Sequence, residues 1–169
     1  NGPAGDLDIA TALVREAMAV ERAKLSELLN CTTPERAASI DFSDPYLRNG
    51  LCLLVSAKSD LRGIADLDRA GRTVAVKKAT TGHLYATQMF KHARVLVLDK
   101  ETACVLEVAQ GKADAFIYDQ IGIYENWRKN QATTRPVLDA FRQEAWAIGL
   151  RKGSDDLRAK VTAFRADYR

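Results

Sequence analysis

The stretch TVAVKKATTGHLYATQMFKHARVLVL, residues Thr73–Leu98, decides the fold class because it contains a strand, a helix and a second strand in succession. Its two ends, TVAVK and RVLVL, are short runs dominated by apolar and β-branched residues, which is typical of buried strands. The central TTGHLYATQMFK opens with two threonines that can cap a helix. Two short strands joined by a helix predict a parallel pair in an α/β sheet.

The same alternation extends in both directions from this stretch. A helix in KETACVLEVAQG is predicted to carry Ala103, Leu106 and Ala109 on one side and to end at Gly111, because glycine suits the residue after a helix. Repeated alternation implies a sheet with helices on both faces. The other predicted elements are strands in LCLLVS (51–56), DAFIYD (114–119) and AWAIGLRKG (145–153), a helical turn ending at Gly71, and helices in QIGIYENWRKN (120–130) and SDDLRAKVTAFRADY (154–168).

The composition is that of an ordinary globular chain. Of the 169 residues, 47% are hydrophobic and 28% are charged, and 25 basic residues against 22 acidic ones give a net charge of +3. This small excess argues against a nucleic-acid partner, and no apolar segment approaches the roughly 18 residues of a membrane span. The first residues, NGPAGDLD, do not resemble a natural start. We therefore expect a processed or trimmed chain, whose beginning says nothing about its compartment.

The three cysteines, Cys31, Cys52 and Cys104, form no CxxC pair and have no zinc-site spacing. Their odd number argues against a complete disulfide framework. Cys52 and Cys104 lie in apolar patterns, so we expect buried free thiols at both positions. The sequence predicts no metal and no other cofactor.

Seven motifs occur in an order that resembles the periplasmic solute-binding proteins of polar amino-acid ABC importers, the bacterial extracellular solute-binding protein family 3. They are TPER, DFSDPY, LLV, IADLDRAGRTVAVKKATTG, YA, GKADAFIYD and WAIGLRKG, and they cover nearly the whole chain from Thr33 onward. The resemblance implies an α/β chain with the two-lobed type II periplasmic-binding-protein fold and doubly wound mixed sheets. Lobe 1 is then expected at 1–52 plus 147–169 and lobe 2 at 53–146, with hinges at Leu51–Ser56 and Ala145–Leu150.

The first lobe looks incomplete beside that family. The family has a strand and a polar, threonine-rich loop before the Thr-Pro-Glu-Arg motif, whereas LSELLNCTTPER runs straight through here. We therefore expect Cys31–Thr33 to join the two ends of a longer segment whose residues are missing from the sequence. The alternative is that the chain truly lacks this segment.

The resemblance carries one binding role to Arg36, because the arginine of the family's Thr-Pro-Glu-Arg motif grips the α-carboxylate of the ligand. Thr33 of the same motif is a further expected ligand-binding residue. A guanidinium group suits this role because it offers two parallel donors and stays charged at any usable pH. The alternative is an ordinary solvated arginine on a helix.

Thr80, Thr81 and Gly82 form the second predicted contact. They lie between a strand end and a helix start, where free backbone N–H groups and the helix dipole favour an anion. The resemblance implies that this loop completes the carboxylate site, although Ala79 stands where the family usually has glycine. The alternative is that a threonine simply caps the helix.

Asp119 ends the predicted strand DAFIYD, at the edge where doubly wound sheets bind ligands. A carboxylate there can pair with an α-ammonium group, and the resemblance implies this use. The alternative is that Asp119 caps the following helix. With Arg36 and the threonine loop, it would complement both charges of an amino acid. Weaker candidates for contacts with the ligand side chain are His83, Tyr85, Tyr118 and Glu144.

We therefore expect a periplasmic, monomeric protein without catalytic activity that binds a small amino acid or related zwitterion and delivers it to the membrane permease of an ABC importer. Hinge motion would close the lobes on the ligand. Two alternatives stay open. One is the amino-acid-sensing domain of a receptor, and the other is a dehydratase-like enzyme on the same fold, with Glu144 as the candidate acid.

Overall fold

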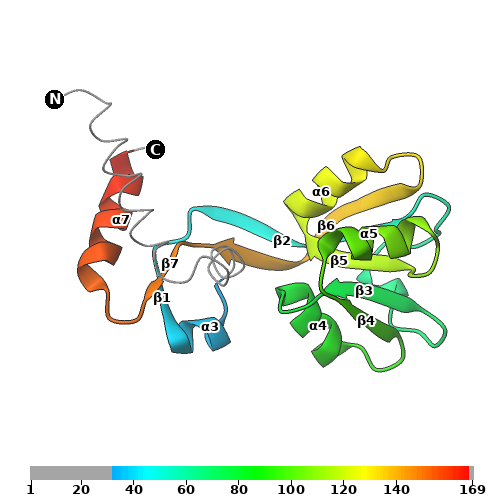
Figure 1. Ribbon diagram of the computed structural model, residues 1–169, viewed down its shortest axis with the longest axis horizontal. Coiled ribbons are helices and arrows are strands. Elements are labelled where there is room, and N and C mark those ends of the chain that lie inside the picture. Colours follow the sequence, from blue (N-terminus) through cyan, green and yellow to red (C-terminus); the bar gives the residue numbers. More distant parts are fainter. Residues whose placement is uncertain (1–31, 168–169) are drawn as a thin grey trace. The chain divides into compact units, whose positions relative to one another are not determined.

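The computed structural model describes residues 32–167, with side chains up to Phe164, and these residues form two compact units (Figure 1). Unit 1 comprises residues 32–48 and 144–167, and unit 2 comprises residues 49–143. Each unit has its own sheet. The α/β class and the mixed sheet predicted from the sequence are therefore confirmed.

The chain passes between the units twice, within strand β2 (Leu47–Ser56) and within strand β6 (Thr134–Trp146). Leu51–Val55, most of one expected hinge, are buried residues of β2 inside unit 2. The lobe boundaries expected from the sequence stay predictions. Cys31, with the start of the expected join, lies outside the described residues.

The sheet of unit 2 has five strands in the order β4–β3–β5–β2–β6. The elements of this unit, besides β2 and β6, are η1 (Ile64–Asp66), β3 (Thr73–Lys77), α4 (Thr81–Met89), β4 (Arg94–Leu98), α5 (Glu101–Ala109), β5 (Ala115–Asp119) and α6 (Gln120–Lys129). β3 is parallel to β4 and β5, whereas β2 is antiparallel to β5. The strand–helix–strand stretch from β3 to β4 matches the prediction, and Gly111 follows α5 with a left-handed φ of 70°.

Side chains of successive residues alternate between the two faces of this sheet and build two cores. One core contains Leu51, Leu53 and Val55 of β2 and Ala86 of α4, and the other contains Cys52 and Leu54 with residues of α5 and α6. The helices therefore cover both faces, α4 one face and α5 and α6 the other (Figure 1).

Helix α5 packs with a different side from the one predicted. Its buried residues are Cys104, Val105 and Val108, whereas Leu106 is 53% exposed. Cys52 and Cys104 are both buried free thiols, as expected. Burial raises the pKa of Cys52 to about 11 and that of Cys104 to about 12, so both thiols stay protonated and unreactive.

Unit 1 contains a two-stranded antiparallel sheet of β1 (Ile40–Phe42) and β7 (Gly149–Arg151), with α3 (Pro34–Ser39) and α7 (Asp155–Asp167). Asp41 of β1 accepts a hydrogen bond from the N–H of Gly153 at 2.8 Å and pairs with Lys152 at 3.1 Å. These contacts fix the turn between β7 and α7. The predicted strand at 145–153 is wrong as a single element, because β6 ends at Trp146 and β7 begins at Gly149.

Candidate functional site

The carboxyl ends of β3 and β5 lie at the same edge of the unit 2 sheet, because these neighbouring strands are parallel. Thr80–Gly82 follow β3, and Asp119 ends β5. A Cβ atom at Gly82 would lie 2.8 Å from the carbonyl oxygen of Ile117. Only glycine therefore lets the first turn of α4 pack this tightly against β5. The structure brings Thr80, Thr81, Gly82 and Asp119 together.

The first turn of α4 combines a cap with unused donors. The Thr80 hydroxyl accepts a hydrogen bond from the N–H of His83 at 3.2 Å and donates to the carbonyl of Lys77 at 2.7 Å. The capping alternative is therefore present. Within the described residues, the N–H and hydroxyl of Thr81 and the N–H of Gly82 have no hydrogen-bond partner. These groups remain for an anion at the positive end of the helix.

Ala79, which precedes this turn, has a left-handed φ of 63° and donates its N–H to Nδ1 of His83 at 3.3 Å. This conformation is strained in alanine because Cβ comes too close to the backbone, whereas glycine has no Cβ and adopts it without this strain. The glycine that the similar family usually has at position 79 would suit the backbone observed there.

We expect Ala79→Gly to raise the stability of the fold by about 0.5–1 kcal/mol, because relief of the left-handed strain exceeds the added freedom of the unfolded chain. The melting temperature should rise by roughly 1–4 °C. Ala57 is the matched control, since it is an exposed turn residue without a positive φ. Ala57→Gly should lower the melting temperature, and equal losses in the two variants would contradict the strain at Ala79.

Asp119 is held by two donors that reach the same oxygen. Its Oδ1 accepts the N–H of Gly122 at 2.9 Å, which caps α6, and the side-chain amide of Asn49 at 3.2 Å. Burial raises the pKa of Asp119, while the hydrogen bonds from Gly122 and Asn49 act in the opposite direction. Capping of α6 is therefore present, and the N–H of Ile121 in the same turn also stabilises the carboxylate. The bonds from Gly122 and Asn49 both use Oδ1, so capping is compatible with ligand binding through Oδ2.

Thr33 and Arg36 lie in unit 1. The Thr33 hydroxyl caps α3 by accepting the N–H of Arg36 at 3.2 Å, and this threonine is buried. Thr32 ties the start of α3 to β6, since its N–H and hydroxyl donate to the carbonyl of Ala145 at 2.9 and 3.2 Å. Arg36 is partly buried in the short helix. The structure thus groups the predicted residues as four in unit 2 and two in unit 1.

The weaker candidates have separate surroundings. Tyr85 packs against Phe141 with ring centroids 5.0 Å apart, and Tyr118 stacks on Phe116 at 5.2 Å, so both rings serve packing. Glu144 is buried in β6, and its Oε1 has no hydrogen-bond partner within the described residues. Sequence reasoning offered no structural role for this unpaired oxygen.

Asn49 is the residue of the site that sequence reasoning missed. It is 4% exposed, and its contact with Asp119 spans 70 positions of the chain. The contact depends on the register of β2 against β5, in which Leu51 lies opposite Asp119. A local sequence pattern carries no information about that register.

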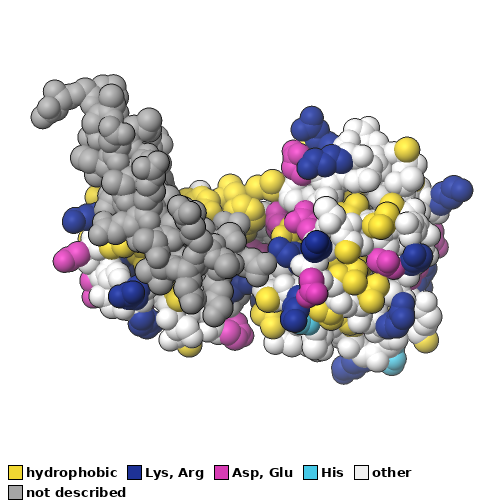
Figure 2. Space-filling model, in the orientation of Figure 1, with side chains coloured by type: hydrophobic (Ala, Val, Ile, Leu, Met, Phe, Trp, Pro, Cys, Tyr) yellow, Lys and Arg dark blue, Asp and Glu magenta, His cyan; other side chains and the backbone are white. Residues whose placement is uncertain are grey.

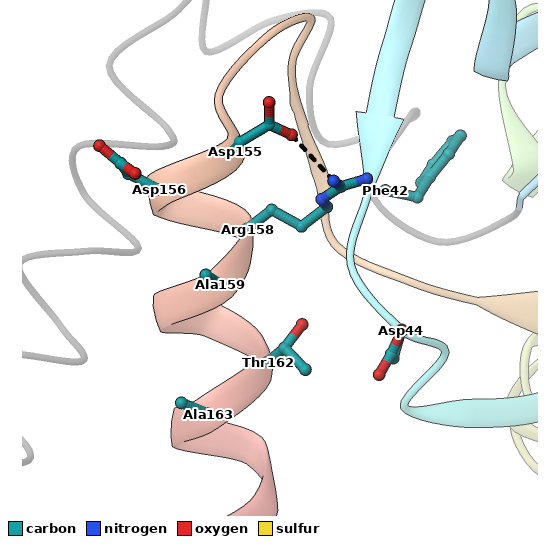
Figure 3. Close-up of a pocket in the computed structure, with 8 residues that line it drawn as sticks. All are labelled: Phe42, Asp44, Asp155, Asp156, Arg158, Ala159, Thr162 and Ala163. Atoms are coloured by element: carbon teal, nitrogen blue, oxygen red, sulfur yellow. Dashed lines mark hydrogen bonds and ion pairs between the residues drawn. The ribbon is translucent and has the colours of Figure 1, made fainter.

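Unit 1 has an open pocket of about 760 Å³ between α7 and the residues around the end of β1 (Figure 3). Two of its lining residues, Arg158 and Asp155, form an ion pair at 2.8 Å. None of the predicted ligand-binding residues lines it. The lining residues are Phe42, Asp44, Asp155, Asp156, Arg158, Ala159, Thr162 and Ala163.

Basic and acidic side chains are interspersed on the face that Figure 2 shows, in keeping with the small net charge. Residues 32–167 contain no group of three or more His, Cys, Asp or Glu side chains arranged to hold a metal ion. None of the helices in this part of the chain is both long enough and apolar enough to span a bilayer.

Several known proteins that the chain resembles are named for amino-acid binding. The ABC transporter glutamine-binding protein GlnH of Bacillus subtilis is 28% identical over 134 residues, which cover 78% of this chain and 47% of GlnH. A structure of arginine-bound ArgBP from T. maritima matches with a TM-score of 0.78 and 27% identity, and the match covers 97% of this chain and 84% of ArgBP.

Two other matches bear on the alternative functions. The virulence sensor protein BvgS of Bordetella bronchiseptica is 34% identical over 87 residues, which are 51% of this chain and 7% of BvgS. The ancestral amino-acid-binding protein AncCDT-1, described as a precursor of cyclohexadienyl dehydratase, matches with a TM-score of 0.75 and 25% identity over 96% of this chain and 78% of AncCDT-1.

The chain spans about half the length of the curated relatives it matches. No protein-family model matches it. The agreement in sequence and in fold with several amino-acid-binding proteins nevertheless extends over most of its length. The chain is a homologue of the solute-binding proteins of amino-acid ABC transporters and has their type II periplasmic-binding fold.

Proposed function

We propose that the chain binds a small amino acid or related zwitterion in the periplasm, as a monomer and without catalysis, for delivery to the membrane permease of an ABC importer. The observation that carries the proposal is the close approach of Gly82 to Ile117. It places the anion-favouring start of α4 beside the strand that ends in Asp119. A positive helix end next to a carboxylate matches the two charges of an amino acid.

The proposed contacts follow from the chemistry of the groups. The N–H and hydroxyl of Thr81 and the N–H of Gly82 would donate to the α-carboxylate, and Asp119 would accept the α-ammonium group. Thr80 would line this contact as the cap of α4, since its hydroxyl already donates to the carbonyl of Lys77. Arg36 would give the carboxylate a charged, bidentate partner, with Thr33 beside it in the motif. The names of the relatives, which include glutamine- and arginine-binding proteins, support an amino acid as the ligand class.

A thermal-shift screen of the twenty amino acids tests this function. A ligand present at 100 times its dissociation constant stabilises the folded state by about 2.7 kcal/mol. That corresponds to a rise in melting temperature of roughly 5–11 °C for a chain of this size. Calorimetry with the best hit should then give a one-site isotherm. The proposal fails if no amino acid shifts the melting temperature.

The sensor alternative is favoured by one observation, the match to BvgS over half of this chain. Both functions require the same binding chemistry, so the screen does not separate them. Sequence adjoining this chain would separate the two functions, because a sensor continues into a signalling domain. For the dehydratase alternative, incubation with cyclic carboxylates should give no product if binding is the function.

A further inference from the structure

We propose that Asn49 is a positioning residue for ligand binding, whose buried side-chain amide holds the carboxylate of Asp119 so that Oδ2 can meet the ammonium group of an amino acid. The ligand part of this inference rests on the proposed function. The hydrogen bond between the two side chains does not, and it can be tested without a ligand.

The orientation of the Asn49 amide is fixed by its surroundings. Its Oδ1 accepts the N–H of Gly50 at 2.8 Å, and because that oxygen can only accept, the NH₂ group must face Asp119. Gly50 itself packs closely against β6, since a Cβ there would lie 2.6 Å from Cβ of Ala140. The donor is therefore held in place by its own backbone and by the neighbouring strand.

The hydrogen bonds from Asn49 and Gly122 use only one of the two carboxylate oxygens of Asp119. Asn49 and the N–H of Gly122 both reach Oδ1, and the N–H of Ile121 also acts on this carboxylate, so its orientation is set by one side chain and by the first turn of α6. Oδ2 is used by neither bond. Two fixed donors on one oxygen keep the other oxygen in one direction, which reduces the ordering that a bound ammonium group would otherwise require.

The amide also favours the charged form that an ammonium group needs. Burial raises the pKa of Asp119 and favours the neutral acid, whereas the donors of Gly122 and Asn49 stabilise the carboxylate. The charge of Glu101 in α5 also raises this pKa. Cys52, on β2, has a pKa of about 11 and stays neutral in the same range. Asn49 is thus a neutral donor that lowers the pKa of Asp119, whereas burial and the charge of Glu101 raise it.

Asn49→Leu removes the donor with little change in size, and calorimetry across pH measures the effect. The probes are L-arginine or L-glutamine, whichever raises the melting temperature more, and its deaminated analogue. We expect the amino acid to bind about tenfold to a hundredfold more weakly and the analogue about as before. The pH at which amino-acid binding is lost on acidification should move upward. Equal weakening of both probes, or an unchanged pH midpoint, would overturn the inference.

Glu101→Gln is a matched control with the opposite sign. It removes the negative charge that raises the pKa of Asp119, so the acid limit of amino-acid binding should move to lower pH. In an Asp119→Asn background, Asn49→Leu should cause little further loss, because the two residues act through one contact. Additive losses would contradict this.

An NMR titration keeps the inference testable if Asn49→Leu does not fold. In the unmodified protein, the side-chain amide signals of Asn49 should shift with the same midpoint as the carboxyl carbon of Asp119. Amide signals that stay constant through that midpoint would overturn the hydrogen-bond role. If no amino acid binds but the two signals titrate together, the proposed function fails while the contact stands.

Discussion

Replacing Arg36 with alanine is expected to weaken amino-acid binding by about thirtyfold to several thousandfold while the fold is kept. Loss of one partner of a buried, hydrogen-bonded charge pair costs about 2–5 kcal/mol, which gives this range of affinity. The cap of α3 survives the change, because Thr33 accepts the backbone N–H of residue 36 and not its side chain. Calorimetry measures the affinity, and circular dichroism with the melting temperature checks the fold.

Arg151→Ala is the matched control, since Arg151 is an exposed arginine of unit 1 outside the proposed contacts. It should leave the affinity unchanged. Arg36→Lys should fall between the two, because lysine keeps the charge but loses the two parallel donors. An Arg36→Ala variant that binds as tightly as the unmodified chain would remove Arg36 from the site.

The core of unit 2 could be predicted because its signals are local. TVAVK, RVLVL and DAFIYD are short apolar runs, and each became a strand at nearly the predicted bounds. The buried side of α5 could not be predicted as well, since it depends on where the helix starts relative to the sheet. The buried residues Cys104, Val105 and Val108 are apolar and helically spaced, as the predicted ones are, so the local pattern allowed either side.

Strand β6 was missed because it lacks the usual strand signals. Pro136 lies in its first half, and charged residues interrupt its apolar ones. Proline cannot donate to a neighbouring strand, so it is tolerated where a strand has a free side. β6 is the last strand in the order β4–β3–β5–β2–β6, which explains how Pro136 fits there.

For the candidate site, the sequence indicated which residue types stand at strand ends but not what holds them. Thr80 and Asp119 each cap a helix, and this role was foreseen as the alternative to binding. Capping and binding use different atoms of one residue, so a sequence pattern cannot separate them. The reason for glycine at position 82 is the carbonyl of Ile117, a contact across 35 residues that only the fold discloses.

Asp119→Asn should weaken amino-acid binding by about thirtyfold to several thousandfold, and should weaken binding of the deaminated analogue by less than about threefold. The reason is that only the ammonium group loses its charged partner. Asparagine keeps an oxygen for the donors of Gly122 and Asn49 and is itself a good helix cap, so the fold should be retained. Calorimetry with both probes measures the difference, and equal losses would contradict the ammonium role of Asp119.

The same substitution should stabilise the ligand-free protein at neutral pH, which separates a binding residue from a merely structural one. Burial raises the pKa of Asp119 in the native state above its ordinary 3.8. Between the ordinary pKa and the raised pKa, the native state therefore holds more protons than the unfolded state. The contribution of Asp119 to stability therefore falls as pH rises through this window, and above the window the full cost of burying the charged carboxylate remains.

Asp119→Asn removes that cost, so the melting temperature of the variant should exceed that of the unmodified chain at pH 7, and the difference should shrink below about pH 3.8. Asp139→Asn, at an exposed position of β6, should show neither change. A lower melting temperature for Asp119→Asn at pH 7 would mean that the carboxylate stabilises the fold, and it would contradict the expected burial penalty.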